Sequence, residues 1–230
     1  MRTAAILPVK SFARAKQRLG ASIDDTLRLQ LAGAMVSDVL LALSQTEAIE
    51  LTIVVTREEG VARAARSQGA VVVEDRAESG QSAAVTLGVA RALAVGIERV
   101  LCIPGDCPAL DPTELDALLA GPHGSATQPQ VVIVPDRHGT GTNGLLLMPP
   151  DAIEPSFGPG SCERHRGLAG EAGAACRLEQ PSSLLLDIDT GADLEALRQR
   201  LEGARSRASR TRAALGKPQH GDLLSRSCGG

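Results

Sequence analysis

Short apolar runs alternate with longer amphipathic stretches along most of this 230-residue chain. The apolar runs are rich in Val, Ile and Leu and show little polar alternation, which is typical of strands buried on both faces. The expected strands cover 4–8, 51–56, 70–74, 100–104, 131–135, 144–148 and 184–188, and the expected helices cover 25–44, 58–68, 82–95, 112–119, 163–172 and 191–201. This alternation predicts an α/β fold with a largely parallel sheet and helices on both faces.

The chain from residue 204 onward breaks this pattern. It is rich in Arg, Ser and Gly, has almost no apolar periodicity, and carries six Lys or Arg residues against one acid. We therefore expect a single domain over 1–203 and a disordered tail over 204–230. The tail has a net charge of +5, so the remaining 203 residues carry −8. Such an acidic body is a poor non-specific binder of polyanions.

Composition excludes several classes of protein. Phe12 and Phe157 are the only aromatic residues, so a nucleic-acid binder that stacks bases on aromatic rings is not expected. The apolar runs are short and interrupted by charge, and the first residues reach Pro8 and Lys10 too early for a signal peptide, so we expect no membrane association. Five cysteines without a Cys-x-x-Cys pair indicate neither a disulfide framework nor a zinc ribbon, and the cytoplasm is the expected location.

A basic loop follows the first expected strand. Ligands of open α/β sheets bind beyond the carboxyl ends of the strands. Here Lys10, Arg14, Lys16 and Arg18 supply four cations within nine residues, which would suit a polyphosphate. The chain has neither the P-loop pattern nor the dinucleotide fingerprint. A solvated basic surface is therefore the alternative interpretation.

Three acids lie at or just beyond the ends of expected strands. Asp106 comes directly after the strand over 100–104, where it either offers an oxygen ligand to Mg²⁺ or starts a turn. Asp187 and Asp189 flank Ile188, and residues i and i+2 of an extended chain face the same side. Two adjacent carboxylates repel each other unless a cation lies between them or one is protonated. The spacing therefore favours a divalent metal, with capping of the next helix as the alternative for Asp189.

Glycine-rich segments offer anion sites. Residues 139–144 lie between two expected strands, and residues 157–161 open the helix that contains Arg164 and His165. Exposed backbone amides at such positions bind phosphates and carboxylates. Residues 79–82 open the third expected helix and could contact a base or ribose. Plain turns and helix caps are the alternatives for all three segments.

Taken in order, these segments resemble the CofC/FbiD family, the guanylyltransferases of coenzyme F420 biosynthesis. The matching stretches are 8–10, 15–19, 104–108, 139–143, 157–161 with His165, 187–190 and 193–194, and they span roughly residues 4–202. The resemblance implies a Rossmann-like, GT-A-like nucleotidyltransferase fold of three layers. It also implies a requirement for GTP and Mg²⁺. The implied acceptor is a phosphorylated three-carbon acid, either phosphoenolpyruvate, 2-phospho-L-lactate or 3-phospho-D-glycerate.

The resemblance implies roles for individual residues. The implied metal ligands are Asp106, Asp187 and Asp189. The implied contacts to the acceptor are Thr142, Gly158 and Ser161. The implied nucleotide contacts are Leu7, Pro8, Val9, Lys10, Arg14, Lys16, Gly80, Ser82, Pro104 and Gly105, and the implied catalytic residues are Lys10, Lys16 and Asp106. The chain departs from the family pattern at Ser82, often Asn in the family, and at Cys162, often Phe.

The expected reaction is transfer of GMP from GTP to the phosphate of phosphoenolpyruvate, or of 2-phospho-L-lactate, with release of pyrophosphate. The attacking phosphate oxygen is already a nucleophile, so catalysis reduces to in-line placement and charge neutralisation. The alternatives are a cofactor cytidylyltransferase or a sugar transferase of the same fold, and a catalytically silent nucleotide-binding module. The sequence leaves open whether the chain forms a homodimer and whether it hands its product to a downstream transferase of the F420 pathway.

Overall fold

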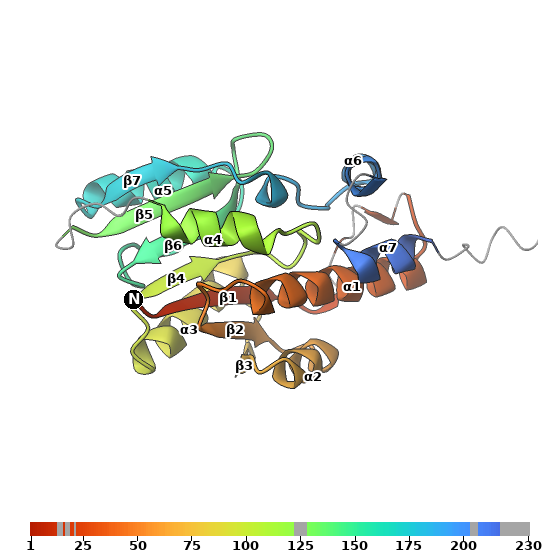
Figure 1. Cartoon of the computed structure of the whole chain (residues 1–230), viewed down its shortest axis with the longest axis horizontal. Coiled ribbons are helices and arrows are strands. Elements are labelled where there is room, and N and C mark those ends of the chain that lie inside the picture. The colour runs from red at the N-terminus through yellow and green to blue at the C-terminus, as the bar shows by residue number, and fades with distance from the viewer. Residues whose placement is uncertain (13–15, 17–18, 21, 122–127, 203–206, 217–230) are drawn as a thin grey trace, which may run out of the picture.

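The computed structural model describes residues 1–12, 16, 19–20, 22–121, 128–202 and 207–216. In this part of the chain, seven strands form a sheet with the order β3-β2-β1-β4-β6-β5-β7 (Figure 1). The strands are β1 (Thr3–Val9), β2 (Leu51–Thr56), β3 (Val71–Glu74), β4 (Arg99–Cys102), β5 (Gln130–Pro135), β6 (Thr142–Met148) and β7 (Ala175–Leu178). The helices are α1 (Asp25–Ser44), α2 (Glu59–Ser67), α3 (Gln81–Ala94), α4 (Pro112–Ala120), α5 (Ser161–Glu171), α6 (Gly191–Glu202) and α7 (Ser209–Leu215). The predicted α/β architecture is confirmed.

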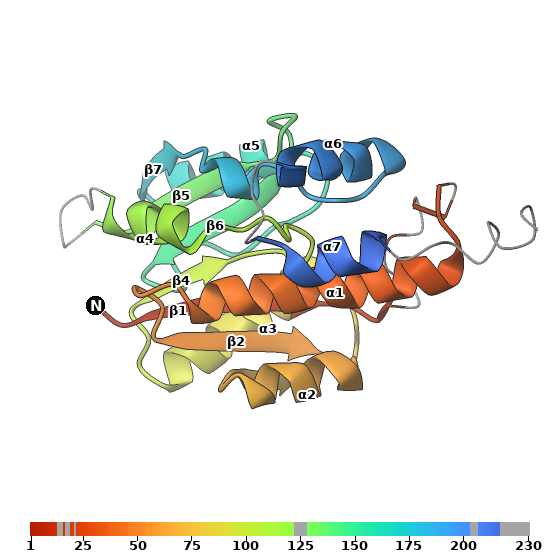
Figure 2. The same ribbon diagram turned by 45° about the vertical axis from the view of Figure 1, so that its right-hand side comes forward.

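Helices cover both faces of the sheet and so form three layers (Figures 1 and 2). One hydrophobic cluster joins α1, α2 and α4 to one face, and a second joins α3 and α5 to the other. The central strand β1 contributes Leu7 to the first cluster and Ile6 to the second, both with no exposed surface. Alternate side chains of one strand therefore enter different cores, which explains the apolar runs without polar alternation.

Close packing against β1 requires a glycine in α3. A Cβ atom added to Gly88 would lie 2.5 Å from Cγ2 of Ile6. That separation is far below a van der Waals contact, so any larger residue would push α3 away from the sheet. Gly88 therefore sets the distance between this helix and the central strand.

One strand runs against the others. β1 pairs in parallel with β2 and β4, whereas β6 is antiparallel to both β4 and β5. The amino-terminal end of β6 consequently lies at the same edge of the sheet as the carboxyl ends of β1 and β4. Thr142 and Asn143 open this strand, so its reversed direction brings them to the edge where ligands of such sheets bind.

Two expected elements are wrong in detail. Residues 184–188 form no strand: a 3₁₀ turn over Ser182–Leu184 is followed by an irregular segment. Leu184 and Ile188 are nevertheless fully buried, which explains the apolar run, because periodicity does not distinguish a short strand from another buried segment. The seventh strand is instead β7, a four-residue edge strand whose side chains are exposed or only partly buried.

The expected disorder after residue 204 is also wrong for the described part of the tail. Residues 209–215 form α7, which lies alongside α1 (Figure 2). Asp38 of α1 is 4% exposed and accepts hydrogen bonds from the backbone N–H groups of Arg210, at 3.1 Å, and Thr211, at 2.8 Å. These two bonds cap the first turn of α7 and attach it to the domain. Residues 203–206 and 217–230 lie outside the described residues.

Helix α1 differs from the expectation that the apolar runs of this chain are too short to cross a membrane. It is long and apolar enough, by length and composition alone, to cross a membrane. Most of it is buried inside the fold, against the sheet on one side and α7 on another. Its apolar character is therefore that of a core helix, which is hydrophobic around most of its circumference.

Candidate active site

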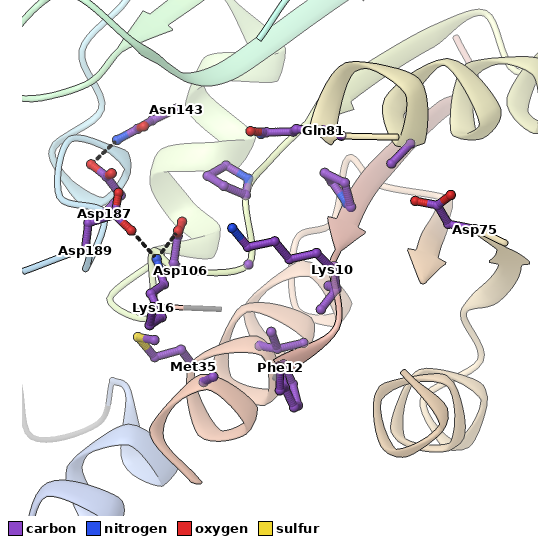
Figure 3. A pocket seen from close by; sticks show the side chains of 18 of the residues that line it. Lys10, Phe12, Lys16, Met35, Asp75, Gln81, Asp106, Asn143, Asp187 and Asp189 are labelled. Atoms are coloured by element: carbon purple, nitrogen blue, oxygen red, sulfur yellow. Dashed lines mark hydrogen bonds and ion pairs between the residues drawn. The ribbon is translucent and has the colours of Figure 1, made fainter. Parts of the chain in front are cut away.

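A cavity of about 400 Å³ opens at the sheet edge described above (Figure 3). Its walls come from the end of β1 and the loop after it, the middle of α1, the connection from β3 to α3, the loop after β4, the start of β6 and the segment that contains Asp187 and Asp189. Figure 3 shows Asp106, Asp187 and Asp189 gathered near Lys16 at one end, and Asp75 at the other. Lys10 extends into the space between them.

A backbone hydrogen bond brings the three predicted acids together. The N–H of Ile188 donates to the carbonyl oxygen of Asp106 at 3.1 Å. This contact holds the irregular segment that contains Asp187 and Asp189 beside the loop after β4, with Ile188 fully buried between them. The three acids thus lie close together as predicted, although the segment over 184–188 is irregular and not the predicted strand.

The ammonium group of Lys16 lies between two of these carboxylates. Its Nζ donates to Oδ1 of Asp189 at 2.8 Å and also to Oδ2 of Asp106. The side chain of Lys16 is only 8% exposed. Burial alone would lower the pKa of Lys16, but the two carboxylates more than reverse this effect, so its pKa is raised and it stays charged. The loop after β1 therefore delivers a permanent cation to the acid cluster.

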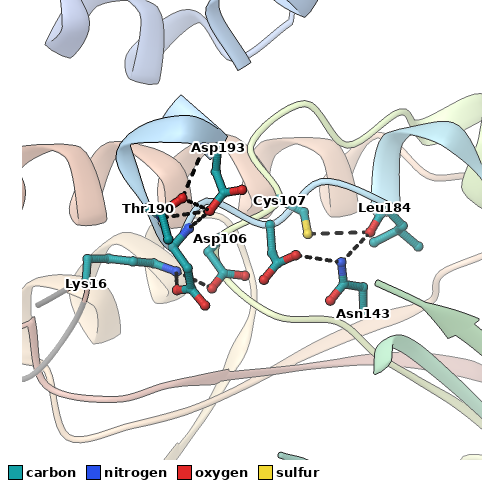
Figure 4. Close-up of polar contacts among 9 residues, drawn as sticks. Lys16, Asp106, Cys107, Asn143, Leu184, Thr190 and Asp193 are labelled. Carbon is teal, nitrogen blue, oxygen red and sulfur yellow. Dashed lines mark hydrogen bonds and ion pairs between the residues drawn. The ribbon is translucent and has the colours of Figure 1, made fainter. Parts of the chain in front are cut away.

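Asp187 is held by a neighbouring amide. Nδ2 of Asn143 donates to Oδ1 of Asp187 at 3.1 Å (Figure 3) and to the carbonyl oxygen of Leu184 at 2.8 Å (Figure 4). Burial raises the pKa of Asp187, and the negative charge of Asp106 raises it further, against the opposite effect of the Asn143 hydrogen bond. The electrostatics thus disfavour the charged form of Asp187 until a further cation compensates it.

A tight turn fixes the direction of Asp189. Oδ2 of Asp193 accepts hydrogen bonds from the backbone N–H of Asp189, at 3.1 Å, and from the N–H and hydroxyl of Thr190, at 2.7 and 2.8 Å. Figure 4 shows Asp193 folded back over Thr190 at the start of α6. In return, the hydroxyl of Thr190 accepts a hydrogen bond from the N–H of Asp193 at 3.3 Å and caps α6. The Asp189 side chain is instead directed at Lys16.

The three carboxylates do not form a ready-made metal cage. Within the described ranges, no group of three or more His, Cys, Asp or Glu side chains is arranged to hold a metal ion. The residues nevertheless fit a divalent ion chemically. Oδ1 of Asp106 is buried and has no hydrogen-bond partner in the described part of the chain. Lys16 forms ion pairs with Asp106 and Asp189, whereas Asp187 accepts its hydrogen bond from the neutral amide of Asn143. Hard oxygen donors with excess negative charge suit Mg²⁺.

The predicted acceptor residues divide into two groups. Thr142 lines the cavity, and its Oγ1 lies 3.0 Å from Nδ1 of His165. Gly158 and Ser161 lie in the turn that opens α5, outside the cavity lining, and the N–H of Ser161 donates to the carbonyl oxygen of Gly158 at 3.0 Å. The φ angle of Gly158 is +112°, which side chains other than glycine rarely adopt.

Most predicted nucleotide contacts lie at the cavity. Those that line it are Pro8, Val9, Lys10, Lys16, Gly80, Pro104 and Gly105. Leu7 is instead fully buried in the core. Oγ of Ser82 accepts a hydrogen bond from the N–H of Phe157 at 2.8 Å, so this side chain connects α3 to the turn before α5. Arg14 lies outside the described residues.

Several cavity residues have no individual role predicted from the sequence. Phe12 and Met35 form apolar wall, whereas Asp75, Gln81 and Asn143 bring polar groups. Asn143 belongs to the glycine-rich segment, but its contact with Asp187 joins residues 44 positions apart. Asp75 follows an ordinary short strand and is 7% exposed. Only the folded sheet, which aligns the ends of β1, β3 and β4, reveals these residues as neighbours.

Comparison with known proteins agrees with this geometry. A family model described as "Guanylyl transferase CofC like" matches residues 3–212. The chain belongs to this CofC-like family. A phosphoenolpyruvate guanylyltransferase of Conexibacter woesei is 49% identical over 215 residues, covering 94% of this chain and 96% of that protein. The enzyme of the same name from Sphaerobacter thermophilus is 36% identical, covering 86% and 93%. The predicted family and its nucleotidyltransferase activity are confirmed.

Solved structures show the same fold at low sequence identity. A protein of Desulfovibrio desulfuricans named for nucleotide-diphospho-sugar transfer superposes with a TM-score of 0.70 at 16% identity, covering 98% of both chains. A nucleotidyl transferase of Methanothermobacter superposes with a TM-score of 0.59 at 18% identity, covering 87% of this CofC-like chain and 98% of that chain. The predicted Rossmann-like nucleotidyltransferase fold is confirmed.

Proposed function

We propose that this CofC-like chain transfers GMP from GTP to the phosphate of phosphoenolpyruvate and releases pyrophosphate. The observation that carries the proposal is the nearly full-length similarity to enzymes named phosphoenolpyruvate guanylyltransferase. The cavity supports it chemically, because acids and lysines meet there at the edge of the sheet. On the family resemblance, we assign the product to coenzyme F420 biosynthesis.

The lysines are the proposed contacts to the GTP phosphates. Lys10 is exposed at the cavity and has no ion-pair partner in the described ranges, so its charge is available to a phosphate. Lys16 is already charged and points into the acid cluster. We propose that Lys16 exchanges Asp106 and Asp189 for phosphate oxygens when GTP binds. Both cations then stabilise the negative charge that develops on the departing pyrophosphate.

Asp106, Asp187 and Asp189 are the proposed Mg²⁺ ligands. When bound, the ion would supply charge neutralisation between the attacking oxygen and the α-phosphate. A cation is needed because like charges repel: two unit charges of the same sign 4 Å apart repel by about 1 kcal/mol in bulk water and by about 4 kcal/mol near a protein surface. Asn143 orients Asp187 for this role, and the turn capped by Asp193 orients Asp189.

Thr142, Gly158 and Ser161 are the proposed contacts to the acceptor. Thr142 is one of the residues that line the cavity. The turn over 157–161 is tied to the same region, since the N–H of Cys162 donates to the carbonyl oxygen of Thr140 at 3.1 Å. We also propose a cytoplasmic location, which is supported by four free cysteines in the described part of the chain.

Pyrophosphate release tests the proposal. We expect release from GTP with phosphoenolpyruvate in the presence of Mg²⁺, and little release when 2-phospho-L-lactate or 3-phospho-D-glycerate replaces it. CTP should not replace GTP. Absence of pyrophosphate with all three acids would contradict the assignment, and release with another of the acids would reassign the acceptor. A variant that carries Asp187→Asn serves as the matched inactive control.

A further inference from the structure

A buried histidine connects the predicted acceptor turn to the cavity. His165 lies in α5 and has no exposed surface. Its Nε2 lies 2.9 Å from the backbone nitrogen of Ser156, and its Nδ1 lies 3.0 Å from Oγ1 of Thr142. Both ring nitrogens are therefore occupied, one by a main-chain group and the other by a side chain that lines the cavity.

The main-chain contact decides where the ring proton is. A backbone N–H can only donate, so Nε2 of His165 must accept and carries no proton. A neutral imidazole then has its proton on Nδ1, which donates to Oγ1 of Thr142. The opposite tautomer and the imidazolium cation would each place two donors against each other at Ser156. Burial, and then the charge of Arg164, lower the pKa of His165 to about 4, which keeps the ring neutral.

With the ring proton on Nδ1, the hydroxyl proton of Thr142 is not used in the hydrogen bond to His165. A threonine hydroxyl has one proton and two lone pairs, and His165 uses one of the lone pairs. The hydroxyl proton has no acceptor in the described ranges of the chain. Thr142 is also the first residue of β6 and faces the cavity. Its free donor is thus available to an anion bound there.

We propose that His165 is a positioning residue that reserves the Thr142 hydroxyl proton for an anionic oxygen of the phosphorylated acid acceptor. If Nδ1 instead accepted, the hydroxyl would donate to the ring and would present only lone pairs to the anion, which repel it. The proposal rests on the proposed function, because it concerns how the same site recognises its acceptor. It adds a residue that does not itself touch the acceptor.

A purely structural role is the competing explanation. The ring of His165 makes an edge contact with Phe157, with ring centroids 5.1 Å apart. Arg164 fixes the same turn, since it donates to the carbonyl oxygens of Ser156, at 3.0 Å, and Phe157, at 3.2 Å. Loss of His165 could therefore disturb the turn without involving Thr142. The test must separate these two effects.

A double-mutant cycle makes that separation. The variants are Thr142→Val, His165→Gln and the double substitution, each assayed for KM and kcat with phosphoenolpyruvate and with GTP. A hydrogen bond to a charged group is strong enough that we expect each single change to lower kcat/KM for phosphoenolpyruvate by about tenfold to hundredfold. The KM for GTP should change by less than about threefold. The double variant should be no worse than Thr142→Val, because both changes remove the same donation.

A conservative variant and a spectrum complete the test. In His165→Asn the amide nitrogen can take the position of Nδ1, so this variant should recover most of the kcat/KM that His165→Gln loses. In the wild-type protein, ¹⁵N spectra of the histidine rings, with His165 identified by its absence in His165→Asn, should show the Nδ1-protonated tautomer. This measurement stands even when a Gln variant fails to fold.

Three results would overturn the inference. Additive losses of kcat/KM in the double-mutant cycle would assign His165 a structural role. A parallel rise of the KM values for GTP and phosphoenolpyruvate would show a general disturbance of the site. The Nε2-protonated tautomer would contradict the proton placement directly. Failure of the proposed function looks different. In that case, the wild-type protein itself releases no pyrophosphate with any acid, while the ¹⁵N spectrum still reports the tautomer.

Discussion

Replacing Asp187 by Asn separates what this carboxylate does for stability from what it does for ligand binding. Burial and the charge of Asp106 raise the pKa of Asp187. A carboxyl group with a raised pKa in the folded state destabilises the fold as the pH rises from its unfolded value, about 3.8, through the folded value. The penalty is therefore largest at pH values above the folded value. Asn removes the charge but still offers an oxygen to Nδ2 of Asn143.

The size of the effect follows from the charges around the cavity. Two carboxylates about 5 Å apart repel by about 3 kcal/mol at an effective dielectric constant of 20. Lys16 offsets part of this repulsion, and solvent screens more of it because Asp187 is only partly buried. We therefore expect the metal-free variant to be more stable by about 1 kcal/mol, or about 2–4 °C in Tm for a chain of this size.

Ligand binding should change in the opposite direction. Mg²⁺ and GTP at about a hundred times their dissociation constant should stabilise the wild-type protein by about 2.7 kcal/mol. The Asp187→Asn variant should lose most of this shift and all measurable turnover. Thermal unfolding with EDTA, with Mg²⁺ and with Mg²⁺ plus GTP measures both effects. Asp151→Asn, an exposed acid beyond the far end of β6, is the matched control. A lower Tm in EDTA, or an unchanged ligand shift, would refute the reasoning.

Three further predictions concern other charged groups. Lys16→Gln should destabilise the metal-free protein by about 1–3 kcal/mol, because two carboxylates lose their cation. It should also lower the Mg²⁺ concentration needed for half-maximal stabilisation, and a higher Mg²⁺ concentration would contradict competition between Lys16 and Mg²⁺ for the same oxygens. The pKa of His165 is about 4 in the folded chain and near 6.5 in the unfolded chain, so the free energy of unfolding should fall by on the order of 3 kcal/mol as the pH drops from 6.5 to 4. Urea unfolding measures this fall, and the His165→Asn variant should lack this contribution. Asp38→Ala should cost about 2 kcal/mol and accelerate protease cleavage before α7, since two backbone N–H groups lose their acceptor; unchanged cleavage would show that apolar packing alone holds the helix.

Local patterns predicted much of the molecule. The bounds of α1 agree with the predicted helix over 25–44, because a helical face such as Val36, Val39 and Leu43 and the capping residue Asp24 lie within one short stretch. The sequence also identified Lys10, Lys16, Asp106, Asp187 and Asp189 of the cavity, because each follows or lies near the end of an apolar run, whereas it did not identify Asp75. Patterns failed at 184–188 and at β7. A buried irregular segment looks apolar, and an edge strand of four residues does not.

Sequence alone determined which residue types were present at each strand end and hence what chemistry the edge of the sheet can support. Only the tertiary structure decided how they meet: the reversed β6 brings Thr142 and Asn143 to that edge, Ile188 docks two acids beside Asp106, and His165 reaches Thr142 from another layer. Each of these contacts joins residues more than twenty positions apart. Their geometry depends on strand direction and on packing between layers, and neither quantity is encoded in a local periodicity.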